Sequence, residues 1–105
     1  MFSHTVDNFQ GRRVVRLFGD LTLEHSRDIL SELLTSLSTH DDVTIDLGES
    51  TKSDLSFFQI LYALLKHPNA KIRFARLPRH LFDNAANLGA GYLMKELSTR
   101  MEKNA

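Results

Sequence analysis

The sequence predicts an α/β fold with a mixed sheet of four to five strands and helices packed mainly on one face. Two observations predict this class. Segments with the alternating apolar pattern of strands take turns with segments of helical spacing, an order typical of parallel β-α-β units. In addition, a short turn at Gln10-Gly11 separates the first two strand-like segments, which indicates an antiparallel hairpin. The predicted order is β-β-α-β-α-β-α in a single domain, residues 1–105.

The first half of the chain contains the hairpin and one helix. Residues 2–9 alternate weakly, and residues 12–19 follow as a second strand that ends at Gly19-Asp20. The next helix is amphipathic, because its apolar residues recur every three or four positions from residue 22 to residue 40. Thr22 is a candidate N-cap for this helix.

The second half repeats a strand–helix pattern. The predicted elements are a central strand at 41–48, a helix from 55 to 65, a strand at 71–77, a helix from 78 to 88, and a short closing helix that frays into a polar tail from about residue 98. In the central strand Asp46 is on the outward phase, near the carboxyl end. Pro68 stops the second helix, and Pro78 suits the first turn of the third.

The composition excludes several classes of protein. Thirteen basic and thirteen acidic residues give no net charge, so we expect no nucleic-acid partner. No cysteine is present, which removes disulfides and thiolate sites and fits a cytoplasmic protein. No apolar run approaches the roughly 20 residues of a membrane span, so we expect no membrane insertion. A chain without net charge is prone to associate, either as a homodimer or with a standing protein partner.

The motifs favour binding over catalysis. The five histidines show no metal-ligand spacing, and there is no phosphate loop and no nucleophile elbow, so we expect no enzyme, no metal and no cofactor. Asp46 lies where parallel sheets place ligands, and a structural or partner-contact role is favoured over acid–base chemistry. Arg76 and Arg79 flank Pro78 and form either solvated surface or a patch for a partner.

The stretch 51–60, "TKSDLSFFQI", joins the central strand to the second helix. Ser53 or Asp54 can cap that helix, whose N-terminus carries unpaired N–H groups and a positive dipole end. Ser56 then lies in the first turn, where a phosphate would be tolerated by the dipole and repelled by Asp54. We expect one of the rings of Phe57 and Phe58 to be exposed, because both cannot face the core equally.

These segments resemble a STAS domain, the anti-sigma factor antagonist family, from about Arg13 to Leu93. The resemblance is carried by "LFGDL", by "IDLGEST", and by "SDLSFFQIL" where the family has Asp-Ser-Ser/Thr-Gly-Leu. It maps Asp54 onto the motif aspartate and Ser56 onto the phosphorylated hydroxyl. The sequence departs from the motif at Leu55, which stands in place of the first serine, and at Phe57, which stands in place of the glycine. Lys52 and Ser53 replace the usual apolar residue before the aspartate.

The resemblance implies a cytoplasmic bacterial protein of signal transduction and transcription regulation. A partner anti-sigma factor kinase would phosphorylate Ser56 and thereby be released. Two alternatives stay open: an unphosphorylated scaffold, in a signalling complex or on the ATPase-like subunit of a lipid-transport ABC system, and a nucleotide-binding domain. The candidate partner-binding residues are Asp20, Asp46, Ser53, Asp54, Phe57, Arg76 and Arg79.

Overall fold

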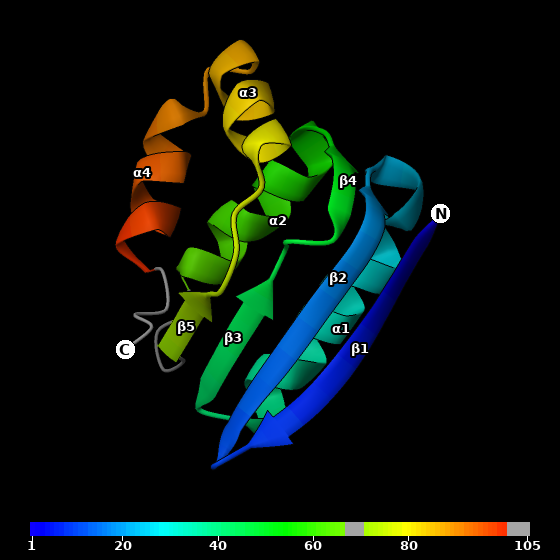
Figure 1. Cartoon of the computed structure of the whole chain (residues 1–105), viewed down its shortest axis with the longest axis vertical. Helices are drawn as coiled ribbons and strands as arrows, with labels where there is room; N and C mark the ends of the chain where they lie inside the picture. The colour runs from blue at the N-terminus through cyan, green and yellow to red at the C-terminus, as the bar shows by residue number, and fades with distance from the viewer. Residues whose placement is uncertain (67–70, 101–105) are drawn as a thin grey trace.

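The computed structural model describes residues 1–66 and 71–100 and begins with a long antiparallel hairpin. Strands β1 (Phe2–Phe9) and β2 (Arg12–Leu21) pair along their length around the turn at Gln10-Gly11 (Figure 1). The strand β2 runs past its predicted end, because Gly19 adopts φ +84° and a register shift at Gly19/Asp20 lets pairing continue. A Cβ atom at Gly19 would lie 2.0 Å from the backbone oxygen of Met1, so only glycine fits there.

The remaining strands are parallel to β2, so the sheet is mixed as predicted. Strand β3 (Asp42–Asp46) pairs with the first half of β2, and β4 (Ser50–Ser53) pairs with its second half. Strand β5 (Lys71–Phe74) pairs with β3 and gives the order β1-β2-β3-β5. The sequence pattern missed β4, because this strand has only four residues and lies directly between a turn and the cap of the next helix.

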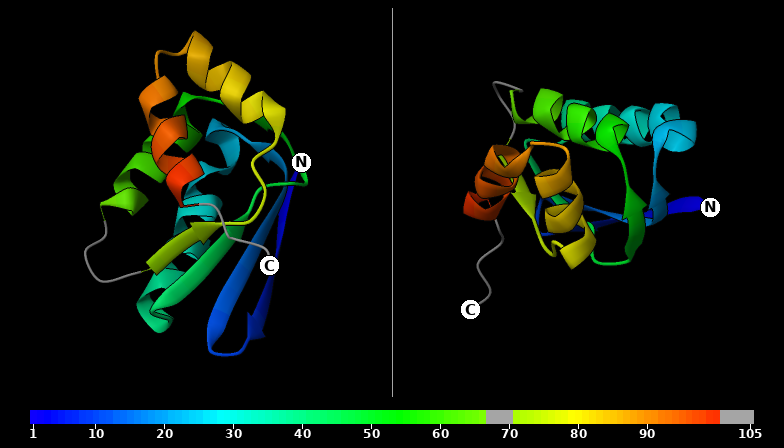
Figure 2. Two further views of the ribbon diagram at one scale, coloured as in Figure 1. Left: turned by 60° about the vertical axis from the view of Figure 1, so that its left-hand side comes forward. Right: turned by 90° about the horizontal axis from the view of Figure 1, so that it is seen from above.

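The helices form two pairs. A 3-10 turn (Leu23–His25) leads into α1 (Ser26–Thr39), and α1 and α2 (Leu55–Leu65) lie side by side over one face of the sheet (Figure 2). Helices α3 (Arg79–Asn87) and α4 (Gly91–Thr99) pack on each other, with α3 against β4 and α4 against β5. The predicted fold class is therefore confirmed, with α3 and α4 at the flank.

The core lies between the sheet and these helices. It contains the inward residues of the strands, Val15, Leu17, Val43, Ile45, Ile72 and Phe74, together with apolar residues from all four helices. Phe57 and Phe58 are only 1% and 2% exposed, so the expectation that one ring is exposed is wrong. The two rings meet at an angle of 58° and share the core, because α2 packs against both the sheet and its neighbours.

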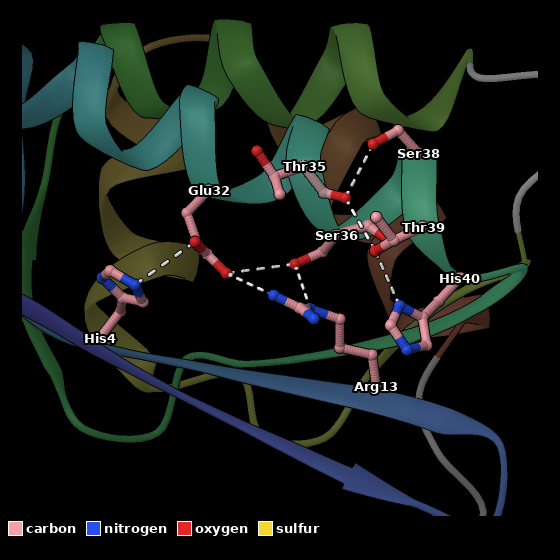
Figure 3. A network of polar contacts seen from close by, with 8 residues as sticks. All are labelled: His4, Arg13, Glu32, Thr35, Ser36, Ser38, Thr39 and His40. Atoms are coloured by element: carbon pink, nitrogen blue, oxygen red, sulfur yellow. Dashed lines mark hydrogen bonds and ion pairs between the residues drawn. The ribbon is translucent and has the colours of Figure 1, made fainter.

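A polar network attaches α1 to the hairpin (Figure 3). Arg13 of β2 donates to Ser36 Oγ at 2.8 Å and to Glu32 Oε1 at 3.3 Å, and His4 of β1 lies 3.4 Å from Glu32 Oε2. Ser36 is fully buried, so its hydroxyl requires these partners. This network lies away from the "TKSDLSFFQI" stretch and has a structural role.

The starts of two helices differ from the predictions. Thr22 precedes the 3-10 turn but makes no side-chain cap, and α1 proper begins four residues later at Ser26. Pro78 is the N-cap residue of α3 rather than a residue of its first turn. The stop at Pro68 and most of the polar tail lie outside the described residues.

Candidate functional site

Asp54 organises the connection between β4 and α2. It is the N-cap of α2: its Oδ1 accepts hydrogen bonds from the Ser56 backbone N–H at 3.0 Å and from the Ser56 hydroxyl at 2.5 Å. Its Oδ2 accepts from the Leu23 N–H at 3.0 Å, and its own N–H donates to the carbonyl of Leu21. One carboxylate therefore fixes both the first turn of α2 and the 3-10 turn before α1.

These donors keep Asp54 ionised. Partial burial alone would raise the pKa of Asp54, but the hydrogen bonds from Ser56, Leu23 and Phe57 outweigh burial, and the pKa is lowered. The cap prediction is thus met at Asp54 rather than at Ser53. The carboxylate is negative beside the hydroxyl of Ser56, which is the residue that the motif singles out.

Ser56 stands at the edge of an apolar groove between α1 and α2. The groove measures about 440 Å³ and is lined by Leu23, Ser26, Arg27, Leu30, Ser56, Gln59, Ile60 and Ala63. Beside it, Leu23 is 70% exposed and Leu55 is 49% exposed. Among the described residues that line the groove, Arg27 is the only charged one. Two hydroxyls, an arginine and the exposed Leu23 thus share one surface, called here the α1–α2 groove, and Leu55 precedes Ser56 in the chain.

Phe57 is a core residue and offers a partner no surface. Its ring is 1% exposed, although its neighbours Leu55 and Ser56 face outward. The periodicity of the helix explains this: Phe57 lies on the same buried side as Leu61 and Leu64. The prediction that Phe57 itself binds a partner is therefore corrected, and the ring does not cover Ser56 from the solvent side.

Ser53 is hydrogen-bonded to His80 and Asn84 of α3, neither of which was among the predicted site residues. The Ser53 hydroxyl lies 3.2 Å from His80 Nδ1, and Asn84 Nδ2 donates to both the hydroxyl and the carbonyl of Ser53 at 3.0 Å. His80 Nε2 lies 2.9 Å from Ser50 Oγ. The i, i+4 spacing of His80 and Asn84 was the signal in the sequence, since it places both on one helix face.

Asp46 and Arg76 meet in a second cluster, at the turn between β3 and β4. Arg76 binds Asp46 through two hydrogen bonds of 2.9 and 3.0 Å and also reaches Glu49, while Arg16 lies 3.4 Å from Asp46. Asp46 is 5% exposed, so its outward phase does not face solvent. A Cβ atom at residue 48 would lie 2.4 Å from Arg76 Nε, so this packing requires Gly48.

The charges of this cluster are already paired. Burial would raise the pKa of Asp46, but the hydrogen bonds from Arg76 and the Gly48 N–H, together with the charges of Arg76 and Arg16, lower it. The same pairing raises the pKa of Arg76. The cluster fixes the turn between β3 and β4, and its geometry is that of a structural ion pair.

Asp20 and Arg79 occupy the same edge of the sheet without joining either cluster. Asp20 accepts from Thr51 Oγ1 at 3.2 Å and lies 2.6 Å from the amino terminus of Met1, whose hydrogen bond lowers the pKa of Asp20. Arg79 is 92% exposed and lies 3.9 Å from Asp83, one turn along α3. Both are surface ion pairs.

One group of side chains in the described part of the chain has the composition of a metal site. Ligand atoms of Asp20, Glu24 and His25 lie within 4.8 Å of one another. Glu24 is 71% exposed, and the carboxylate of Asp20 is already engaged by the amino terminus and Thr51. The arrangement is an open surface cluster, and we assign no metal to it.

The helices are too short for a bilayer. Across residues 1–66 and 71–100, none combines the length and the apolar character that a transmembrane span requires.

Known structures share the fold. An anti-sigma factor antagonist from Mycobacterium paratuberculosis is 13% identical, with a TM-score of 0.74 over 95% of this chain and 94% of that one. The anti-sigma factor antagonist SpoIIAA in its unphosphorylated form is 12% identical, with a TM-score of 0.66 over 98% and 89%. A DUF3478 protein with a SpoIIAA-like fold from Shewanella loihica is 19% identical, with a TM-score of 0.53 over 87% and 78%.

The sequence itself identifies the family. No curated protein gives a significant match. The family model described as "Mlab, STAS domain" matches residues 4–95, which include every candidate site residue. The strand and helix order, the cap at Asp54 and this match agree with the resemblance in the sequence, and the chain belongs to the STAS domain family.

Proposed function

We propose that the protein is a regulatory protein-binding module of the anti-sigma factor antagonist type, which docks its partner on the first turn of α2 and the α1–α2 groove. One observation carries this proposal: Ser56 lines an apolar groove together with the exposed side chain of Leu23, and the residue before Ser56 is the exposed Leu55. Exposed apolar side chains around a polar control residue are typical of a surface that a partner covers.

Ser56 is the control residue of this surface. A kinase partner would transfer the γ-phosphoryl group of ATP to Ser56 Oγ, and the hydroxyl proton would pass to a base as ADP leaves. The phosphate would replace a hydrogen bond donor to Asp54 with nearly two negative charges next to that ionised carboxylate. The turn would then lose its present shape, and the apolar groove would acquire a charge that a docked partner must desolvate.

The comparisons support this proposal in one respect. A similar solved structure is described as an anti-sigma factor antagonist in its unphosphorylated form. Asp54 and Ser56 occupy the motif positions of the acid and the hydroxyl in this sequence. Arg27, which lines the same groove, provides a positive charge that could receive the phosphate.

Incubation of the full chain with its kinase-like partner and ATP tests the switch. We expect the mass of one phosphate on the peptide that contains Ser56, no such mass on Ser56→Ala, and dissociation of the complex as the phosphate appears. Ser38→Ala is the matched control, because it removes a hydroxyl of α1 that binds the Thr35 carbonyl and does not line the groove. Partner release without phosphate on Ser56 would contradict the switch.

A second function, an unphosphorylated scaffold on an ATPase-like subunit, is favoured by one observation. The Ser56 hydroxyl is already engaged as a donor to Asp54 in the first turn of α2, so the structure does not present it freely to a kinase. A scaffold would form a complex with an ABC ATPase that is stable in the presence of ATP. Its affinity would be indifferent to Ser56→Ala and lowered by Leu55→Ala, whereas the switch requires Ser56.

A further inference from the structure

We propose that His80 and Asn84 of α3 form a proton-sensitive latch that holds the β4–α2 connection in its docking shape. The connection itself is only Asp54, which lies between Ser53, the last residue of β4, and Leu55, the first residue of α2. Strand β4 meets α3, and both polar side chains on that face of α3 bind serines of β4. The latch is thus built from two residues four positions apart on one helix.

The hydrogen bonds fix which nitrogen of His80 carries the hydrogen. Ser50 Oγ donates to the carbonyl of Leu47 at 2.6 Å, so it must accept the hydrogen of His80 Nε2 at 2.9 Å. In the neutral ring Nδ1 is then an acceptor, and the Ser53 hydroxyl donates to it at 3.2 Å. The oxygen of Ser53 in turn accepts from Asn84 Nδ2 at 3.0 Å. Every polar hydrogen in this series of hydrogen bonds therefore has an acceptor.

Protonation of His80 at Nδ1 disrupts this arrangement of donors and acceptors. Nδ1 would become a donor, so it and Asn84 would both direct hydrogens at Ser53 Oγ, whose own hydrogen would lose its acceptor. The hydroxyl of Ser50, a residue that is 7% exposed, is already committed to Leu47, and the backbone of Ser50 favours the charged ring by less than burial disfavours it. The protonated ring would also be a charge in a half-buried place without a counter-ion among the hydrogen bonds that it makes.

The charged residues of the surrounding elements do not compensate. Lys52 lies on β4, Glu49 lies on the preceding turn and binds Arg76, and Arg79 pairs with Asp83 on α3 itself. None of them shifts the pKa of His80; burial lowers it, and a hydrogen bond with the backbone of Ser50 only partly opposes that effect. Because the folded state binds the proton less readily than the unfolded chain, the latch is intact above about pH 6.5 and weakens as the pH falls below that value.

The latch bears on partner binding only if the proposed docking surface is right, but it can be tested without any partner. Ser53 is adjacent to Asp54, so movement of α3 away from β4 would release the residue before the cap. Acidification would then loosen the first turn of α2, which the α1–α2 groove requires. His80 and Asn84 act here as positioning residues, since neither faces the groove.

Imidazole NMR of the full chain, with backbone amide exchange recorded between about pH 7.5 and about pH 5.5, tests the latch. We expect His80 to be protonated on Nε2 at the upper pH and to titrate below its ordinary value of 6.5. Protection of the amides of Ser56 and Phe57, corrected for intrinsic exchange, should fall several-fold on acidification. An Nδ1-protonated ring, or a midpoint at or above 6.5, would overturn the proposal.

Variants make the test specific. His80→Gln keeps a donor toward Ser50 but cannot titrate, so its protection should no longer depend on pH, whereas His40→Gln at the end of α1 should behave like the parent. Asn84→Ala removes the competing donor at Ser53, so the midpoint of His80 should rise. An unchanged or lower midpoint would contradict the competition of the two donors at Ser53. If the midpoint and tautomer are as expected but no partner binds, the latch stands and the proposed function fails.

Discussion

Two aspartates with lowered pKa values, Asp46 and Asp54, lie at the same edge of the sheet and have different roles. Asp46 is 5% exposed and accepts hydrogen bonds from Arg76 and Gly48, so its charge is already paired. Asp54 is bound by the Ser56 hydroxyl and by backbone N–H groups, and next to it lies an apolar groove. The first closes a turn, and the second borders a surface.

The difference shows that a carboxylate at the end of a parallel strand is a weak sign of a binding site. In both cases hydrogen bonds outweigh burial and hold the group ionised. The two sites differ in what lies around them: an arginine partner for Asp46, and a hydroxyl with exposed leucines for Asp54. The proposed docking surface is therefore distinguished by its exposed apolar area rather than by its charge.

The largest expected effect separates the core side of the first turn from its outer side. Phe57→Ala should lower the free energy of unfolding by about 3–5 kcal/mol, because it leaves a cavity in the core. Leu55→Ala, two residues earlier and half exposed, should change it by less than about 0.5 kcal/mol. Urea unfolding followed by circular dichroism measures both. Equal losses would contradict the assignment of Phe57 to the core and of Leu55 to the docking surface.

Asp46→Asn should have the next largest effect. Loss of the charged hydrogen bonds to Arg76 should lower the free energy of unfolding by about 1.5–3 kcal/mol. The pKa of Asp46 is lowered in the folded state, so its contribution is present above about pH 3.8 and is lost as the pH falls below that value. The difference between the variant and the parent should therefore shrink in acid, and binding of a partner at neutral pH should be unchanged.

Asp54→Ala should lower the free energy of unfolding less than Asp46→Asn does, but it should lower the affinity for the partner more. Loss of the N-cap should lower the free energy of unfolding by about 1–2 kcal/mol. Because the same carboxylate also holds Leu23, the α1–α2 groove should lose its shape and partner affinity should fall. Titration of the partner by calorimetry, with Asp46→Asn as the comparison, measures this. The account fails here if Asp46→Asn weakens binding more than Asp54→Ala does.

Ser56→Ala should be nearly neutral for stability. It removes one hydrogen bond to Asp54, which contributes about 0.5–1.5 kcal/mol, and gains part of this back through the higher helix propensity of alanine. The midpoint temperature of thermal unfolding should change by a few degrees at most for a domain of this size. A large destabilisation would show that the hydroxyl is a structural cap, as Asp54 is, and not a free control group.

Much of the fold followed from periodicity, and the exceptions have identifiable causes. The hairpin, the parallel strands and the helices were predicted from apolar spacing, because each buries one regular face. Strand β4 was missed because Ser50–Ser53 has no apolar alternation and is held by pairing with β2. Burial of both Phe57 and Phe58 was missed because α2 is covered on more than one side.

The site was predicted in part. The cap at Asp54 and the position of Ser56 followed from capping chemistry and from the family motif. The groove depends on how α1 and α2 pack, and the bonds of His80 and Asn84 to β4 join positions about thirty residues apart, which no local pattern encodes. The pairing of Asp46 with Arg76 is non-local for the same reason.

The central claim is that the partner docks on the Ser56 side of this edge and not on the Asp46 side. Hydrogen exchange of the full chain, alone and in complex with its kinase-like or ATPase-like partner, tests it most directly. The account predicts protection of residues 23–30 and 54–63, with residues 46–49 and 76 unchanged. Protection confined to the turn around Gly48 and Arg76, with exchange in the first turn of α2 unaltered, would contradict it.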